Sequence, residues 1–287
     1  MPASTTDHYY DHYKPSLPAG AIFTALFAIS TVLHAWQLIR TRTWYFTPFV
    51  IGGTFEVIGY VSRVVASVQY PNSAKLPYIL QAVLLLLAPA LFAASIYMVL
   101  GRIIRVTGGE AYSLVRVNWL TKIFVFGDIL SFLIQGVGGG MLASADTAKQ
   151  RDHGQLFITI GLIVQIIFFG LFILTTIHYN WRLSKAPTDA SRTTAVSWQM
   201  YLIVLYVSNG LIMIRSIFRL VEYVQGEDGE LLSKEVYLYI FDAVLMFLSM
   251  ATFNWKHPSS LIPGKKKDQP DLEVSSGSFL MQERGRK

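Results

Sequence analysis

The sequence predicts an all-α polytopic membrane protein with seven transmembrane helices, its N-terminus outside and its C-terminus in the cytosol. Three observations lead to this prediction: the composition, seven long apolar stretches, and the distribution of basic and tryptophan residues. Of the 287 residues, 53% are hydrophobic and only 15% are charged. A soluble domain of this length carries more charge on its surface, so the composition favours a membrane protein.

Each apolar stretch is long enough to cross the hydrocarbon core as a helix, which takes about 20 residues. The loops between the stretches are short, so residues 17–255 are predicted to form one transmembrane domain. Residues 1–16 are expected to be an extracellular tail, and 256–287 a cytosolic, basic and disordered one. The predicted spans are, in order, Leu17–Ile39, Trp44–Val68, Tyr78–Leu100, Trp119–Leu142, Leu156–Ile177, Trp198–Val224 and Val236–Trp255.

The orientation follows from the basic residues, because Lys and Arg favour cytoplasmic loops. Fifteen of the 24 Lys and Arg fall in the loops and the tail on one side, and five fall on the other. Tryptophan favours the headgroup level, and all six tryptophans lie at helix ends on the basic side: Trp36, Trp44, Trp119, Trp181, Trp198 and Trp255. That side is predicted to be cytosolic. There the run Lys265–Lys267 is expected to attract anionic lipid headgroups.

Eight ionisable residues lie within the predicted spans, where a charge is costly and is usually kept for a reason. They are Glu56, Arg63, Lys122, Asp128, Arg215, Arg219, Glu222 and Asp242. Four are acidic and four are basic, which predicts pairing within or between the second, sixth and seventh helices. For Arg63 and Arg219 the candidate partners are Glu56, Glu222 and Asp242. The acidic loop before the seventh span, which includes Glu235, is expected to be solvated.

Two interpretations of these interior residues remain open. They form a buried ion-pair network that fixes helix register, or they line a polar cavity in the outer half of the membrane. A kink at Pro89 and a deformable segment at Gly138–Gly140 would suit a mobile bundle. As candidate substrate-binding residues we take Glu56, Arg63, Gln81, Asp128, Gln135, Gln165, Arg215, Arg219, Glu222 and Asp242.

Several protein classes are disfavoured by the sequence. The seventh span has no lysine for a retinal Schiff base, and no Walker loop for ATP is present. The chain has no cysteine and lacks the helix-end motifs of G-protein-coupled receptors. A zinc hydrolase would need several intramembrane ligands, whereas only His34 lies well inside a span. We therefore expect no catalytic residue, no metal and no cofactor. No nucleic-acid partner is expected either, since the basic residues flank membrane helices.

Several segments together resemble the fungal RTA-like proteins, also called the lipid-translocating exporter family. The resemblance covers about residues 13–257. It is carried by YKPSL at 13–17, EVIGYVSR at 56–63, LQ at 80–81, LAPALFAASIYM at 87–98, GRII at 101–104, DILSFLIQ at 128–135, GGG at 138–140, GL at 161–162, Gln165, RSIFRLVE at 215–222 and YIFD at 239–242.

The resemblance implies a fungal seven-span protein of the plasma membrane. It further implies a role in transport or flip-flop of sphingoid long-chain bases and in resistance to membrane-active toxins. No catalytic residue set comes with it, so we expect a translocase for an amphipathic lipid or lipid-like toxin, not an enzyme. An acid among Glu56, Asp128 and Asp242 would hold the amine of a sphingoid base. Glutamines would hold its hydroxyls, and arginines a phosphate. The alternative is a seven-helix lipid-sensing receptor that signals to the cytosol.

Overall fold

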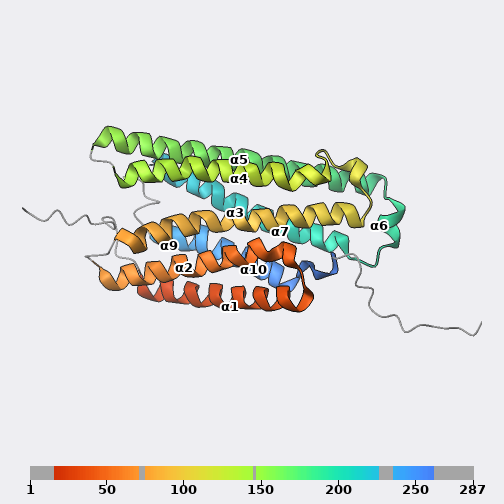
Figure 1. Cartoon of the computed structure of the whole chain (residues 1–287), viewed down its shortest axis with the longest axis horizontal. Helices are drawn as coiled ribbons and strands as arrows, with labels where there is room; N and C mark the ends of the chain where they lie inside the picture. Colours follow the sequence, from red (N-terminus) through yellow and green to blue (C-terminus); the bar gives the residue numbers. More distant parts are fainter. Residues whose placement is uncertain (1–15, 71–74, 145–146, 226–234, 262–287) are drawn as a thin grey trace, which may run out of the picture.

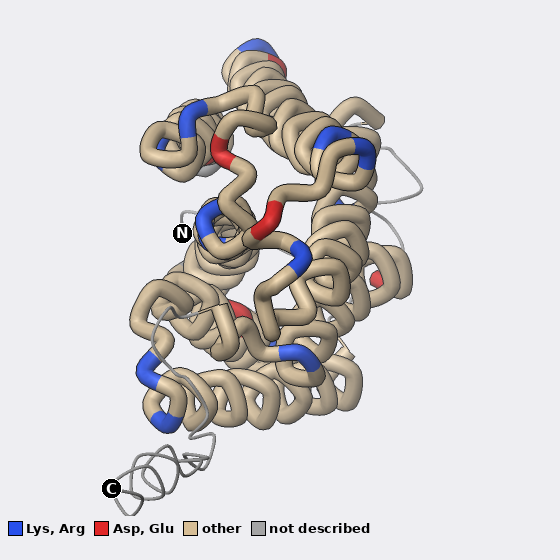
Figure 2. The backbone as a smooth tube through the Cα atoms, turned by 90° about the vertical axis from the view of Figure 1, so that its right-hand side faces the viewer, with Lys and Arg blue, Asp and Glu red and all other residues tan. Residues whose placement is uncertain are grey.

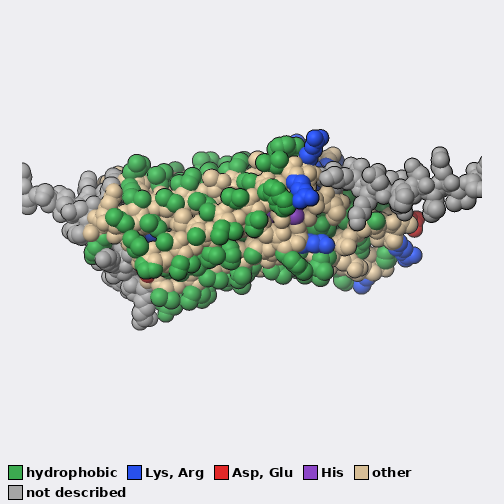
Figure 3. Space-filling view, turned by 90° about the horizontal axis from the view of Figure 1, so that it is seen from below, with side chains coloured by type: hydrophobic (Ala, Val, Ile, Leu, Met, Phe, Trp, Pro, Cys, Tyr) green, Lys and Arg blue, Asp and Glu red, His purple; other side chains and the backbone are tan. Residues whose placement is uncertain are grey.

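In the computed structural model of the chain, long helices run side by side along one axis (Figure 1). The structure describes residues 16–70, 75–144, 147–225 and 235–261. Within these ranges, seven helices are long and apolar enough to cross a membrane, which confirms the predicted fold class. One side of the bundle is apolar along most of its length, with Lys and Arg gathered toward one end (Figure 3). Such a surface is suited to contact with lipid.

The first six spans are single helices, and the seventh has three parts. The spans are α1 (Leu17–Thr41), α2 (Thr47–Gln69), α3 (Lys75–Val106), α4 (Val117–Ala143), α5 (Ala148–Lys185), α7 (Trp198–Gln225) and the run of α9 (Glu235–Leu238), the π-helical η3 (Tyr239–Val244) and α10 (Leu245–Trp255). Short helices connect or follow them: η1 (Trp44–Phe46), η2 (Glu110–Tyr112), α6 (Asp189–Thr193) and η4 (Pro258–Leu261).

Local sequence sets several of the helix ends. α1 and α2 each have a proline in the first turn, where the missing N–H costs no helical bond. α5 begins with a capping box, in which the Thr147 side chain accepts from the Gln150 backbone and the Gln150 side chain accepts from the Thr147 backbone. α5 has 38 residues and is about 57 Å long. The expected span Leu156–Ile177 is only its apolar centre, because the polar turns at both ends are also helical.

α3 lies in the middle of the bundle. It packs against α2, α4 and α7, while α4 pairs with α5, α5 packs on α7, and α10 packs on both α7 and α1. Buried aromatic side chains fill the space between these helices. One group, Phe46, Phe49, Phe92 and Phe253, joins η1, α2, α3 and α10. α3 thus contacts helices on both sides of the bundle.

The two ends of the bundle differ in composition. We call them the Ser16 end, where α1 begins, and the α6 end, which faces the viewer in Figure 2. The six tryptophans all lie in helix segments toward the α6 end. Basic residues gather there too, among them Arg40, Arg102 and Arg182 (Figure 2). The predicted alternation of the spans is therefore present, and the cytosolic location of the α6 end remains a prediction.

The expected deformable segment Gly138–Gly140 is helical, because α4 continues to Ala143. A Cβ at Gly138 would lie 2.7 Å from the Gly154 carbonyl oxygen, so this glycine permits close packing of α4 on α5. The expected tail from residue 256 is folded up to Leu261, whose side chain is buried. The rest of that tail, the N-terminal tail up to residue 15 and Lys265–Lys267 lie outside the described residues.

Candidate functional site

Asp242 joins the sixth and seventh spans in the interior of the bundle. It lies in the π-helical segment η3, and it is 2% exposed. One carboxylate oxygen accepts a hydrogen bond from Nε of Arg215, and the other accepts from Nη2 of Arg219 at 2.8 Å. Both arginines are on α7. A π-helical turn is wider than an α-helical one and often occurs at functional sites. Here it carries the residue that both arginines bind.

Arg215 also connects Asp242 to α3. Its Nη2 donates to the carbonyl oxygen of Leu85 at 2.7 Å. In an α-helix this oxygen would accept from the N–H of residue 89, but Pro89 has no N–H to donate. Arg215 thus satisfies a backbone acceptor that a proline leaves free. The described α3 runs through Pro89 without a break in the helix.

Arg219 forms the second connection within this cluster. Its Nη1 donates to Oε2 of Glu222 at 2.8 Å, an i,i+3 pair on α7. Arg219 therefore bridges two acids, Glu222 and Asp242, both of which are among its predicted partners. We use the name arginine cluster for Arg215, Arg219, Glu222 and Asp242.

Arg63 has a partner that sequence analysis missed. Its Nη2 lies 2.6 Å from Oε1 of Glu235, at the first residue of α9. Its Nε also donates to the Tyr239 hydroxyl at 3.1 Å, and the Ser16 backbone N–H donates to the Glu235 carboxylate at 2.9 Å. The expectation that Glu235 belongs to a solvated loop is wrong, because it is the N-terminal residue of the seventh span. Its position directly before the apolar run was the signal that could have identified it.

Glu56 lies beside the arginine cluster without joining its ion pairs. Its side chain is 1% exposed, and Oε1 has no hydrogen-bond partner among the described residues. Asp242, Arg215 and Arg219 all interact with it electrostatically. Within the described part of the chain, however, no Lys or Arg lies within ion-pair distance of Glu56. The described arginines around Glu56 pair with other acids, and none of them forms an ion pair with Glu56.

Asp128 is the second buried acid that forms no ion pair with a described residue. It lies near the middle of α4 and is 5% exposed, and Oδ2 has no hydrogen-bond partner among the described residues. The Tyr97 hydroxyl of α3 interacts with this carboxyl group, though no regular hydrogen bond joins them. The Tyr97 ring contacts Phe124 at 5.5 Å and Phe172 at 4.4 Å between centroids. A carboxyl group thus lies next to a set of aromatic rings.

The candidate glutamines are buried in two places. Gln135 of α4 donates to Gln165 of α5 at 3.2 Å and to the Ser131 hydroxyl at 2.7 Å. Ser131 in turn donates to the Gly161 carbonyl oxygen. These bonds join α4 to α5, a structural role that sequence analysis did not assign to them. Gln81 is buried on α3, one turn before Leu85.

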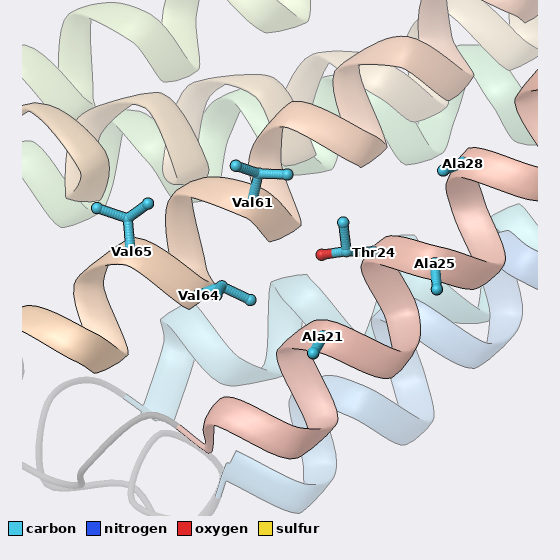
Figure 4. Close-up of a pocket in the computed structure, with 7 residues that line it drawn as sticks. All are labelled: Ala21, Thr24, Ala25, Ala28, Val61, Val64 and Val65. Atoms are coloured by element: carbon cyan, nitrogen blue, oxygen red, sulfur yellow. The ribbon is translucent and has the colours of Figure 1, made fainter.

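Neither of the two described pockets is the polar cavity that we expected. One is a shallow groove of about 280 Å³ between α1 and α2 (Figure 4). Small and β-branched side chains line it, with Ala21, Thr24, Ala25 and Ala28 opposite Val61, Val64 and Val65. The other, about 740 Å³, lies by α6 at the end of the bundle. Neither includes any of the ten candidate residues, and the ion pairs favour the interpretation as a buried network.

Several buried polar residues were not among the candidates. Ser208 and Asn209 of α7 and Ser249 of α10 are at most 1% exposed, and their side-chain oxygens have no partner among the described residues. A polar residue inside an apolar run was the available signal. His257 follows α10, and burial lowers the pKa of its imidazole to about 4. Its ring packs edge-on against Phe46 at 5.4 Å between centroids.

Metal ligands do not gather in the part of the chain that the structure describes. No three His, Cys, Asp or Glu side chains there form a group that could hold an ion. The acids of the interior instead lie next to arginines, as at Asp242, or next to aromatic rings, as at Asp128. A carboxyl group in such a medium of low dielectric constant can bind a cation or a proton.

Comparisons with known proteins give a consistent family assignment. A family model described as RTA1 like protein matches residues 49–265. Protein RTA1 of Saccharomyces cerevisiae is 38% identical, over 92% of this chain and 94% of its own. Protoporphyrin uptake protein 1 of that species is 35% identical, over 88% and 93%. Its sphingoid long-chain base transporter RSB1 is 25% identical, over 93% and 78%. No solved structure matches the chain.

Proposed function

The chain belongs to the RTA1-like protein family, and from this premise we propose that it moves amphipathic lipids with a cationic head across a membrane. The seven spans make it a multi-pass membrane protein. A relative named as a sphingoid long-chain base transporter supports a role of this family in membrane lipid transport. Lipids with a cationic head are the substrate class that we propose, and we expect sphingoid long-chain bases to be its main members.

The observation that carries this proposal is that Asp128 is buried without a basic partner among the described residues. It is a buried carboxyl group near the middle of the membrane span, and no Lys or Arg of the described residues pairs with it. An unpaired carboxylate in hydrocarbon is costly, whereas one that binds an ammonium group is compensated. The aromatic rings around Tyr97 add faces that attract a cation. Asp128 is therefore the acid that we assign to the amine.

The other candidates are less suited to a substrate. Asp242 has both oxygens bonded to arginines, so an incoming amine would have to displace them. Arg63, Arg215 and Arg219 each bind at least one acid, which leaves them poor partners for a phosphate. Gln135 and Gln165 already bond to one another. We therefore assign these residues to the structure that holds the seven helices in register.

In the proposed cycle the lipid amine enters from the bilayer and binds Asp128, while the hydrocarbon tail remains among the lipid chains. On α4, the side chains of Phe126, Ile129 and Leu133 are exposed and can face lipid, while Asp128 lies on the opposite, buried face of the helix. A rotation of α4 about its axis would bring the carboxyl group to the lipid-facing side. The chain needs no hydrolytic step for this process, so we propose a translocase and not an enzyme.

The experiment is transport of a fluorescent sphingoid base by the purified protein in liposomes. Movement between leaflets, above that in protein-free liposomes, supports the proposal. Binding without movement would support the alternative of a lipid-sensing receptor. A porphyrin serves as a second substrate, because a relative is named protoporphyrin uptake protein 1. Preference for this dicarboxylate over the amine would contradict a cation site at Asp128.

The cellular setting is also part of the proposal. We propose that the protein resides in the plasma membrane with the α6 end in the cytosol, and that it contributes to resistance to membrane-active compounds. Lys265–Lys267 would then lie beside anionic headgroups. Because the chain has no cysteine, single cysteines at Thr147 and Thr193 can test the orientation. An impermeant thiol reagent on intact cells should label the first and not the second.

A further inference from the structure

Among the described residues, the acids around Arg215 and Arg219 outnumber these two arginines. Three acids, Glu56, Glu222 and Asp242, interact with two arginines, Arg215 and Arg219. Arg215 donates to Asp242 and to the Leu85 carbonyl, and Arg219 donates to Asp242 and Glu222. Each arginine is thus engaged twice, and Glu56 is the acid that is left over.

Burial decides the protonation state of this extra acid. Glu56 is 1% exposed and Oε1 has no hydrogen-bond partner among the described residues. An ionised carboxylate in such a place would be desolvated and would repel Asp242, and the attraction of Arg215 and Arg219 offsets only part of this cost, because both arginines bind Asp242. The neutral acid avoids both costs. The groups that face it are Asp242 from η3, Arg215 and Arg219 from α7, and Tyr60 from its own helix. Among the described residues, α1 and α3 add no titratable group to this set.

A series of polar groups leads from Glu56 toward the Ser16 end. Tyr60 lies one turn further along α2, fully buried, with a hydroxyl that has no hydrogen-bond partner among the described residues. It interacts electrostatically with Glu56 and with Arg63. Its ring stacks with Tyr239 at 6.3 Å, and the Tyr239 hydroxyl accepts from Arg63. Arg63 binds Glu235, whose side chain is 13% exposed.

We propose that Glu56 is a proton-binding site, which exchanges its proton with the Ser16 end through the Tyr60 hydroxyl and the Glu235 carboxylate, while Arg63 holds Glu235 in place. On release, the carboxylic acid becomes a carboxylate and the proton leaves by way of these groups. The carboxylate then competes with Asp242 for Arg215 and Arg219. Since Asp242 is in the π-helical segment, this competition loosens the seventh span from α7. Coupling of this event to lipid movement rests on the proposed function, but the proton site does not.

The proton site is tested by infrared spectroscopy of the purified full-length protein in liposomes. The parent is Asp128→Asn, which removes the other acid that is buried without an ion pair among the described residues. A C=O stretching band of a protonated carboxyl group should be present and should vanish in alkaline buffer. It should be absent from Asp128→Asn/Glu56→Gln and retained in Asp128→Asn/Glu110→Gln, since Glu110 is exposed. A missing band in the parent, or one that persists without Glu56, would overturn the proposal.

Folding gives a second readout. Gln has the shape of the neutral acid, so Glu56→Gln should yield as much folded protein as the wild type. Loss of folded protein would overturn the proposal, because it would mean that the charged form is required. Tyr60→Phe should keep the band but slow its loss after an alkaline jump. No change in that rate would overturn the proposed path.

Coupling is measured separately, with a pH-sensitive dye inside liposomes during transport of a sphingoid base. Proton movement should accompany lipid movement and should stop in Glu56→Gln. Lipid movement without proton movement in the wild type would overturn the coupling, even if the infrared band is present. Absence of lipid movement with a normal band would instead contradict the proposed function and leave the proton site supported.

Discussion

Arg215 supplies the carbonyl oxygen of Leu85 with the hydrogen bond that α3 itself cannot make, at a distance of 2.7 Å. The helical donor is missing because residue 89 is a proline. The same guanidinium binds Asp242 through Nε. One arginine thus connects the central helix α3, the sixth span α7 and the π-helical part of the seventh span.

The link between Arg215 and Leu85 predicts a coupling between Arg215 and Pro89. Arg215→Lys retains one bond to Asp242 but loses the fork that also reaches Leu85. We expect a loss of about 1.5–3 kcal/mol, the usual contribution of a hydrogen bond to a charged group. In a Pro89→Ala background the loss should be smaller, because the substituted alanine has a backbone N–H that can donate to Leu85. Thermal unfolding of the four proteins in detergent measures this double-mutant cycle, and additive effects would contradict the link.

The Arg63–Glu235 pair predicts that Glu235→Ala destabilises the protein. Removing one partner of a buried pair is destabilising, at a cost of about 3–5 kcal/mol. Because Glu235 is 13% exposed, we expect the lower end of that range. Arg63→Gln combined with Glu235→Gln should regain part of the folded yield, measured by size-exclusion chromatography. The matched control is Glu110→Ala at an exposed acid, and equal losses in both single variants would remove the pair from the account.

Alanine substitutions at two neighbouring glycines of α4 should affect stability very differently. A Cβ at Gly138 would lie 2.7 Å from the Gly154 carbonyl oxygen and 2.8 Å from the Ile158 backbone nitrogen. Backbone atoms cannot move aside, so Gly138→Ala should separate α4 from α5 and lower the melting temperature. A Cβ at Gly139 would meet no atom of another helix within 4 Å, so Gly139→Ala should be neutral or gain about 1 kcal/mol of helix propensity. Similar effects of both changes would argue against this packing.

Most of the fold can be predicted from the lengths of the apolar stretches and from the unequal distribution of Lys and Arg between the two sides. The Arg219–Glu222 pair could also be predicted, because i,i+3 residues share a helix face. The position of Glu235 directly before the apolar run could have placed it at the start of the seventh span, but the sequence does not show that it pairs with Arg63 of the second span. A choice among acids on different helices depends on their relative register, which hydrophobic periodicity does not specify.

The least predictable feature was whether the candidate residues line a cavity or form a closed network. Ten polar residues on several helices are compatible with a cavity or with a closed network, and only the three-dimensional contacts distinguish them. In the sequence, Asp242 has no basic residue within one helical turn, so its partner must come from another helix or from a ligand. In the structure both of its oxygens bind arginines of α7. Asp128 has a similar sequence context, yet no described base reaches it, because its neighbours on α3 and α4 are aromatic.

His257 predicts a pH dependence of stability. Burial lowers the pKa of this imidazole from 6.5 to about 4, so the folded protein binds the proton less readily than the unfolded chain. Its contribution is therefore fully present above pH 6.5 and is lost as the pH falls from there through about 4. His257→Gln should flatten the melting temperature across this window. A wild-type protein whose stability rises as the pH falls from 6.5 would contradict the assignment.

The central claim, that Asp128 binds the amine of a transported lipid, is tested most directly by Asp128→Asn in liposomes. The measurement compares movement of a fluorescent sphingoid base with that of its uncharged N-acyl analogue. Folded yield is recorded in parallel, and Asp152→Asn at an exposed acid serves as the matched control. Loss of a charged hydrogen bond of about 1.5–3 kcal/mol should slow the cationic lipid about tenfold or more. The analogue should be much less affected. Unchanged movement of the cationic lipid, or equal loss for both lipids, would contradict the account.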